Sequence, residues 1–338
     1  MRTLIVGVGA LGGVVATRLK SCGAPVWLAT RNPQVAAQLR ESGLRVSGVA
    51  GELAVGVEDV LPLEEYGRHD RFDLIILATK AGDALAVAPR LMALLGAEGT
   101  LLTLQNGGVA QMLADRLLDR RILGGLSNLG ATMTAPGVYE QRNAGHLLIG
   151  ELAGGVSERA ERVHEWLGRA LEVRVSGNMR GAVWSKLALN CSVTTIGAIA
   201  GQSMRTYIAH PEGRDLFDRT YDEALSVALA SGAQPEPMLV DPVPPGFKGR
   251  PGSLSARNAW VAQILRSYGD VKPSMLQDFE RGRPTEIDFV NGYAVALGRQ
   301  LSVETRANAA IVAMVHAITR RTCVPHLALL GEILRSLS

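Results

Sequence analysis

A cluster of glycines directly after the first apolar run is the feature that most constrains how this chain folds. The run 3–6 ends at Gly7, and the segment that follows, 10–21, has apolar residues at helical spacing. Glycines in this pattern allow a tight turn, a close approach of the backbone to a ligand, and close packing of helix on strand. Because the N-terminus of a helix attracts phosphates, the motif predicts a dinucleotide site built from Gly7, Gly9, Ala10, Leu11 and Gly12.

The rest of the first half alternates between strand-like and helix-like segments. Apolar runs predict strands at 25–29, 74–78 and 100–104, and helical patterns fill 34–41 and 85–95. This alternation with short connections predicts a parallel sheet with helices on both faces. Between 124 and 151 we expect antiparallel strands that extend the sheet, followed by a helix over 156–171 and a last strand at 173–175.

After about residue 178 the strand signals give way to long helical patterns. These cover 179–190, 212–231, 255–267, 286–299 and 306–320. The four prolines between 241 and 252 exclude regular structure there and predict a loop. The predicted fold class is therefore α/β, with a Rossmann-type N-terminal domain at 1–177 and a mostly α-helical C-terminal domain at 178–338.

Composition excludes several other classes of protein. Of the 338 residues, 47% are hydrophobic and 20% charged, which is typical of a globular chain and not of a disordered one. The net charge of +3 is small and no basic run is dense, so nucleic acid is not expected as a partner. No apolar run reaches the length of a membrane span. Three widely spaced cysteines match no metal site and no disulfide framework, which favours the cytoplasm.

The ends of three further predicted strands bear on the cofactor. An NAD site usually has a carboxylate after the second strand, whereas this chain has Arg31 there. A guanidinium can bind a 2′-phosphate, so the sequence favours NADP (NADPH) over NAD. Lys80 and Asn106 follow the next two strands, where they can approach the cofactor and its nicotinamide; each can also be an ordinary turn residue.

A row of polar residues crosses the first helix of the second half. Lys186, Asn190 and Thr194 are spaced by four, so they lie on one face if the helix persists through Thr194. Their neighbours are apolar. Spacing alone leaves two interpretations open: a surface lysine at the edge of an amphipathic helix, or a lysine that is partly buried for a chemical purpose.

Taken together, these segments resemble the ketopantoate reductase family over the whole chain. The resemblance depends on the glycine motif with Arg31, on two strand-end motifs, and on three segments of the second half. These are Thr79-Lys80, Gln105-Asn106-Gly107, Trp184-Ser185-Lys186-Leu187 with Asn190, Ser274 to Asp278, and Thr285 to Asp288 with Asn291-Gly292.

The resemblance implies roles for particular residues. Lys186 would be the catalytic acid and Glu286 would assist in the substrate site, with Asn106, Asn190, Thr194 and Ser274 also near substrate or nicotinamide. Thr194, Met204 and Val271 stand where the family often has asparagine, and 241–252 resembles an insertion.

The implied reaction is NADPH-dependent reduction of a 2-oxo acid, with 2-dehydropantoate (ketopantoate) as the first expected substrate. Hydride addition to a ketone creates an alkoxide, which a protonated lysine can stabilise and protonate. We expect the active site in a cleft between the two domains, no metal, and a possible homodimer. The alternatives are a reductase of a different branched 2-oxo acid, a non-catalytic NADP-binding sensor, and a 3-hydroxy acid dehydrogenase.

Overall fold

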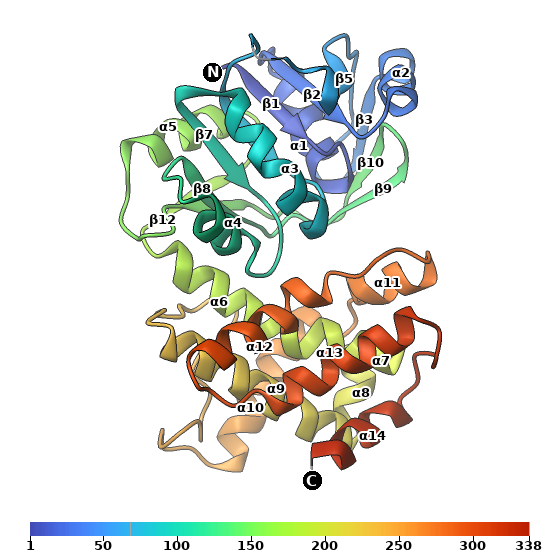
Figure 1. Cartoon of the computed structure of the whole chain (residues 1–338). Helices are drawn as coiled ribbons and strands as arrows, with labels where there is room; N and C mark the ends of the chain where they lie inside the picture. The colour runs from blue at the N-terminus through green and yellow to red at the C-terminus, as the bar shows by residue number, and fades with distance from the viewer. Residues whose placement is uncertain (68, 338) are drawn as a thin grey trace. The chain divides into compact units, whose positions relative to one another are not determined.

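A computed structural model describes residues 1–67 and 69–337 of the chain. It divides into two compact units, Met1–Met179 and Arg180–Ser338 (Figure 1). The predicted α/β class is confirmed, because the first unit holds a mostly parallel sheet with helices and the second unit is helical. The domain boundary predicted from sequence lies two residues before the boundary between these units.

The first unit is built on an eight-stranded sheet with the order β12-β11-β8-β7-β6-β1-β2-β5. Neighbouring strands are parallel except β8 and β11, which run antiparallel. The central strands are apolar on both faces because helices cover both faces. The strands are β1 Thr3–Val6, β2 Val26–Thr30, β5 Val60–Pro62, β6 Phe72–Leu77, β7 Leu95–Thr103, β8 Ile122–Ser127, β11 Leu147–Gly150 and β12 Val173–Ser176.

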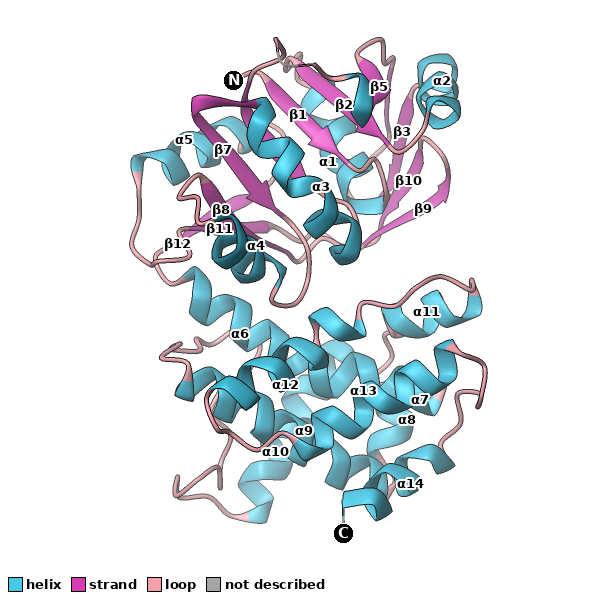
Figure 2. Cartoon of the chain, viewed as in Figure 1, coloured by secondary structure: helices cyan, strands magenta, loops and turns pink. Residues whose placement is uncertain are grey.

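Helices cover both faces of this sheet. In Figure 2, α3 and α4 lie in front of it, and α1 and α5 lie behind it. The start of α2 is set by Asn32, whose side chain accepts a hydrogen bond from the Val35 N–H, and by Pro33 in the first turn. The helices of this unit are α1 Ala10–Ser21, α2 Pro33–Ser42, α3 Ala81–Leu94, α4 Val109–Leu117 and α5 Glu158–Leu167.

One part of the strand prediction was wrong. The antiparallel strands expected between 124 and 151 were all assigned to the main sheet, but only β8 and β11 belong to it. β9 Ala131–Ala135 and β10 Val138–Gln141 form a second sheet with β3 Leu44–Gly48 and β4 Leu53–Val55. The physical reason is that this small sheet packs on α1, where the buried ring of Tyr139 from β10 lies against Gly13.

The second unit is an assembly of helices around one apolar core. The sequence predicted five of its helices, including the four longest, and missed the short ones and α14, which is as long as α12. The predicted helix 286–299 begins too early, because Val290 has a non-helical backbone (φ −105°, ψ −96°) and α12 starts after it. The helices are α6 Met179–Leu189, α7 Thr195–Ala200, α8 Met204–Ile208, α9 Pro211–Ala230, α10 Leu254–Tyr268, α11 Ser274–Glu280, α12 Asn291–Gln300, α13 Arg306–Thr319 and α14 Ala328–Leu337.

The proline-rich segment 241–252 has no regular structure, as predicted, but it is tied to the helices of the second unit. The Tyr221 hydroxyl donates to the Pro242 carbonyl at 2.9 Å, and the Trp260 indole N–H donates to the Asp241 carbonyl at 2.8 Å. Phe247 is buried in the core. The segment is therefore an ordered loop.

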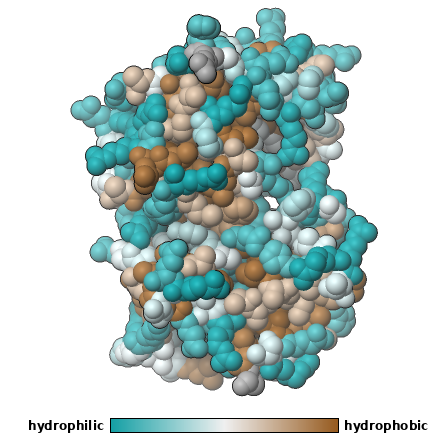
Figure 3. Space-filling view, in the orientation of Figure 1, coloured by the Kyte–Doolittle hydropathy of each residue, from teal (hydrophilic) through white to brown (hydrophobic). Residues whose placement is uncertain are grey.

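The surface is mixed in character. On the face shown in Figure 3, hydrophilic side chains alternate with smaller apolar patches in each unit. Among the helices of the described residues, none combines the length and the apolar character that a membrane crossing requires.

Candidate functional site

The glycine motif forms the turn between β1 and α1, at the carboxyl edge of the main sheet. Gly7 has φ +94°, and a Cβ there would lie 2.7 Å from the Thr79 nitrogen. A Cβ on Gly12 would lie 2.0 Å from the Gly7 carbonyl oxygen, so both positions require glycine. A Cβ on Gly9 would meet nothing within 4 Å. The space beside Gly9 and the N-terminus of α1 at Ala10 is what a pyrophosphate needs.

Two neighbouring strand ends bring further predicted residues to the same edge. Lys80 directly precedes α3 and is exposed, and Asn106 is exposed in the turn after β7. The buried Gln105 joins their two loops, because its Nε2 donates to the carbonyls of Leu77 and Thr79, both at 2.9 Å. The Gln105 Oε1 and the Thr79 Oγ1 are buried without a hydrogen-bond partner among the described residues. Such orphaned polar atoms fit an edge that receives a polar ligand.

Arg31 follows β2 at this edge and is exposed. Its Nη2 lies 2.5 Å from Oδ2 of Asp83 in α3, with 78% and 47% of the two side chains exposed. Asp83 was not singled out from the sequence, where nothing links a residue of α3 to the end of β2. A phosphate bound to Arg31 would compete with this carboxylate, so the pair bears directly on the choice of cofactor.

Tyr139 braces the glycine turn and was also not singled out as a site residue. Its hydroxyl donates to the Val8 carbonyl at 3.1 Å, and burial raises its pKa. A Cβ on Gly13 would lie 2.0 Å from the Tyr139 ring, so the missing side chain of Gly13 makes room for this ring. The only sequence signal for this contact is Gly13 itself, at a helix position where a larger residue would otherwise be expected.

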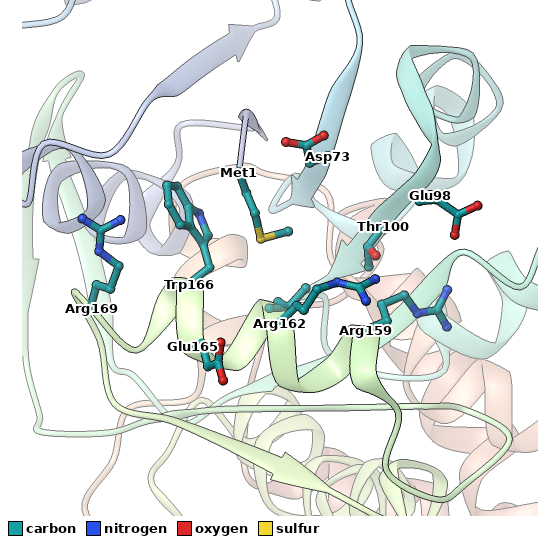
Figure 4. A pocket seen from close by; sticks show the side chains of 10 residues that line it. Met1, Asp73, Glu98, Thr100, Arg159, Arg162, Glu165, Trp166 and Arg169 are labelled. Carbon is teal, nitrogen blue, oxygen red and sulfur yellow. The ribbon is translucent and has the colours of Figure 1, made fainter.

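A separate cavity of about 700 Å³ lies at the opposite, amino edge of the sheet (Figure 4). Strand starts and one face of α5 line it, with Asp73, Thr100, Arg162 and Trp166 among its side chains. Ligands of open α/β sheets bind at the carboxyl ends of the strands. The cavity contains none of the predicted site residues and is not the candidate active site.

In the second unit, Lys186, Asn190 and Thr194 form a row on one side of a buried helical stretch. From Gly181 to Ala200 these three residues are partly exposed, and every other residue is buried. The common face predicted from their spacing is therefore present. The surface interpretation of Lys186 does not fit, because a surface helix would expose a wider stripe of residues.

The row is straightened by a π-helical turn, Asn190–Thr194, between α6 and α7. In an α-helix of 3.6 residues per turn, each step of four residues drifts by about 40° around the axis. A π-turn, with hydrogen bonds over five residues, has more residues per turn, so a four-residue step falls short of a full turn and offsets that drift. The Thr195 N–H donates to the Asn190 carbonyl in this way, and the Thr194 hydroxyl donates to the same oxygen at 2.8 Å.

The surroundings of Lys186 change its acidity. Burial lowers the pKa of its ammonium group from 10.5 to about 8. Desolvation disfavours the charged form and so makes the group a stronger acid. Burial is the cause of this shift. A lysine near pKa 8 is still mostly protonated at neutral pH and can release its proton readily.

Ser274 and Glu286 lie on other elements of the second unit. Ser274 is exposed at the start of α11. The preceding residue, Pro273, packs closely on Gly197, because a Cβ on Gly197 would lie 2.8 Å from the Pro273 ring. Glu286 is partly buried, just before the 3₁₀ turn Ile287–Phe289 that leads into α12.

The start of α12 is fastened to the polar row. The Asn291 Nδ2 donates to the Cys191 carbonyl in the π-turn at 3.1 Å. The Trp184 and Tyr293 rings, from α6 and α12, are 5.7 Å apart. The segments that carry Ser274 and Glu286 thus pack against the same helical stretch that carries Lys186, Asn190 and Thr194.

Comparison with known proteins identifies the family of this chain. Residues 3–154 match the family model "Ketopantoate reductase PanE/ApbA", and residues 178–319 match the model of the C-terminal part of the same proteins. The 2-dehydropantoate 2-reductase of Pyrococcus horikoshii is 30% identical over 322 residues, which cover 94% of this chain and 97% of the relative. The corresponding enzyme of Archaeoglobus fulgidus is 27% identical over 94% of this chain and 97% of its own length.

Solved structures give the same result for the fold. A PanE/ApbA family ketopantoate reductase from Ralstonia eutropha superimposes with a TM-score of 0.79 at 25% identity, over 95% of this chain and 99% of that one. D-Mandelate dehydrogenase, solved with NADH and anilino(oxo)acetate, shares the fold at a TM-score of 0.81 and 21% identity, over 96% of this chain and all of that one. The chain therefore belongs to the ketopantoate reductase family of NADP-dependent oxidoreductases.

Proposed function

We propose that this protein reduces 2-dehydropantoate to pantoate with NADPH and that Lys186 donates the proton. The observation that carries the proposal is the partly exposed row of Lys186, Asn190 and Thr194 on an otherwise buried helix, headed by a lysine of pKa about 8. The curated relatives named above carry the same reaction in their names. A protein that only sensed NADP would have no use for an acidified lysine in this row.

The residues at the carboxyl edge of the first unit fit NADPH. The space beside Gly9 and the N-terminus of α1, at Ala10 and Leu11, would hold the pyrophosphate, and Arg31 would bind the 2′-phosphate. Lys80 and Asn106 would contact the nicotinamide half, where the Thr79 hydroxyl and the Gln105 carbonyl oxygen offer unused hydrogen-bonding capacity. When bound, NADPH supplies the hydride that reduces the substrate carbonyl carbon.

Lys186 would stabilise and then neutralise the negative charge that forms on the substrate. As the carbonyl carbon accepts a hydride, its oxygen becomes an alkoxide, and the Nζ of Lys186 would pass a proton to it. Because the pKa of Lys186 is near 8, proton transfer from it requires less free energy than transfer from an ordinary lysine. Partial burial also strengthens the attraction between the ammonium and the alkoxide, because water screens it less.

The polar residues near Lys186 would orient the substrate. Asn190 and Thr194 add hydrogen-bonding groups to the row. Ser274 would donate a hydrogen bond to the carboxylate of the substrate, and Glu286 would accept one from its hydroxyl group. Met204 is buried in the helical core and contributes no polar contact, and Val271 is 53% exposed. The substrate set is thus less polar than in a site with asparagines at these positions, which is the reason to include other branched 2-oxo acids in the test.

The decisive experiment is NADPH oxidation across a panel of 2-oxo acids that includes 2-dehydropantoate, followed at 340 nm. We expect 2-dehydropantoate to give the highest kcat/KM and NADPH to be preferred to NADH. The Lys186→Met variant should still bind NADPH, but its kcat should be about 10²- to 10⁴-fold lower. If another branched 2-oxo acid gave a higher kcat/KM than 2-dehydropantoate, that acid would be the substrate. If the protein bound NADPH tightly but turned over no member of the panel, it would be an NADP sensor and not an enzyme. A homodimer remains a prediction, which sedimentation velocity can check.

A further inference from the structure

Asn291, the first residue of α12, is polar and yet fully buried. Its side chain contacts Cys191, which belongs to the same π-turn as Asn190 and Thr194. We propose that Asn291 is a positioning residue: its side chain holds the π-turn Asn190–Thr194 in place and so keeps Asn190 and Thr194 in line with Lys186. The consequence for catalysis rests on the proposed function, whereas the consequence for the helix does not.

The π-turn leaves a backbone carbonyl in need of a donor, and Asn291 supplies one. In an α-helix the Cys191 carbonyl would accept from the N–H of Thr195, four residues later. Here the Thr195 N–H donates to Asn190 instead. The Cys191 oxygen accepts from the Asn291 Nδ2 at 3.1 Å and from the Thr195 hydroxyl. An unpaired buried carbonyl is costly, so these side-chain donors compensate the π-turn for a hydrogen bond that an α-turn would make by itself.

A buried network fixes which way the Asn291 amide points. Its Nδ2 also donates to the Asn308 Oδ1 at 3.0 Å. The Asn308 Nδ2 in turn donates to Glu223 at 2.8 Å and to the Thr220 carbonyl at 3.1 Å. The Cys191 carbonyl and the Asn308 Oδ1 can only accept hydrogen bonds. The Asn291 atom that faces them must therefore be the donor, which is the amide nitrogen and not the amide oxygen.

Glu223 anchors this network at the start of α13. Its two carboxylate oxygens accept from the backbone N–H groups of Ala307 and Asn308 at 2.8 and 2.9 Å. Burial raises the pKa of Glu223, and these hydrogen bonds act in the opposite direction. A carboxylate at a helix N-terminus is favourable, so the helix holds the Glu223 end of the network rigidly.

The network does not look optimised for stability. The Asn291 Oδ1 is buried and has no hydrogen-bond partner among the described residues. A half-satisfied buried amide destabilises a core compared with an apolar side chain of the same shape. The geometry that the Asn291 nitrogen enforces on the π-turn gives this costly residue a purpose.

Loss of the π-turn would disturb the row that carries the chemistry. If 190–194 became α-helical, the Thr195 N–H would return to Cys191, and each step along the row would drift by about 40°. Thr194, two steps from Lys186, would then point away from it. Misplacement of a substrate-orienting group by about 1 Å can lower turnover about 100-fold.

The test uses the full-length protein with two variants of Asn291 and one control. Asn291→Leu has a similar shape without a donor, and Asn291→Ser retains a hydroxyl that is too short to span to Cys191. Tyr221→Phe is the matched control, because it removes one buried hydrogen bond to a carbonyl, that of Pro242, outside the π-turn. For each we would measure kcat and KM for 2-dehydropantoate, the Kd of NADPH by fluorescence titration, the Tm, and the crystal structure of the Leu variant.

We expect both Asn291 variants to raise the KM for the 2-oxo acid or lower kcat by about 10- to 100-fold, with an unchanged Kd for NADPH. Tyr221→Phe should have kinetics close to those of the wild type, although its Tm should be similar to or lower than that of the Asn291 variants. In the crystal structure of Asn291→Leu, the Thr195 N–H should donate to Cys191. Kinetics no worse than those of Tyr221→Phe, or an unchanged π-turn, would overturn the proposal. If the wild type reduces no 2-oxo acid, the proposed function fails, and the crystal structure alone decides on Asn291.

Discussion

The pH dependence of Lys186 gives the sharpest test of the proposed mechanism. Burial lowers its pKa to about 8, so about nine-tenths of the molecules carry the proton at pH 7 and about one-tenth at pH 9. If Lys186 is the proton donor, kcat/KM should fall about tenfold for each pH unit above 8, because only the ammonium form can donate. An ordinary lysine would leave the profile level to about pH 10.

The assay is the initial rate of NADPH oxidation between pH 6 and 10 at low 2-oxo acid concentration, which reports groups of the free enzyme. Lys186→Met should lower kcat by about 10²- to 10⁴-fold. Lys186→Arg retains a cation that cannot release its proton, so its small remaining activity should not change between pH 7 and 10. A wild-type profile that stays level to pH 10, or a Lys186→Met variant within a few-fold of wild type, would refute the assignment.

The remaining predictions concern the cofactor edge. Arg31→Ala should weaken NADPH binding by about 10- to 150-fold and NADH binding much less; equal losses would show that Arg31 does not bind the phosphate. Asp83→Asn releases Arg31 from its ion pair, so the Kd of NADPH should fall about two- to fivefold, and a higher Kd would contradict the competition. Gly9→Ala should keep the wild-type Tm and lose NADPH binding, whereas Gly12→Ala should also lower the Tm, because its Cβ would collide with the Gly7 carbonyl; equal Tm values would refute this contrast. Tyr139→Phe should raise the Kd of NADPH about two- to tenfold, and no change would show that its hydrogen bond to Val8 does not hold the turn.

Much of the first unit can be predicted from local patterns because its function depends on local geometry. The strand Thr3–Val6 and the helix Ala10–Ser21 coincide with their predictions, since the glycines between them force both boundaries. The second sheet could not be predicted in the same way. Its strands are short, they pair over long stretches of chain, and β10 lies between β3 and β9 although it is far from β3 in sequence. Asp83 could not be predicted for a related reason. Its partner Arg31 is distant in sequence, and only the pairing of strands in the sheet places the two side chains together.

The second unit shows a different limit, which concerns the hydrogen bonds of the backbone. Spacing by four gives a common face for Lys186, Asn190 and Thr194, but it assumes an α-helix throughout, and the row would then twist around the axis. Whether five consecutive residues adopt a π-turn depends on donors that arrive from elsewhere, here the Asn291 amide, which is remote in sequence. The acidity of Lys186 has the same origin: it depends on how much of the ammonium group is shielded by surrounding helices, not on its neighbours in the chain. The sequence therefore points to residues that can carry the chemistry, whereas their alignment depends on the Asn291 amide at the start of α12, which Asn308 of α13 holds in place.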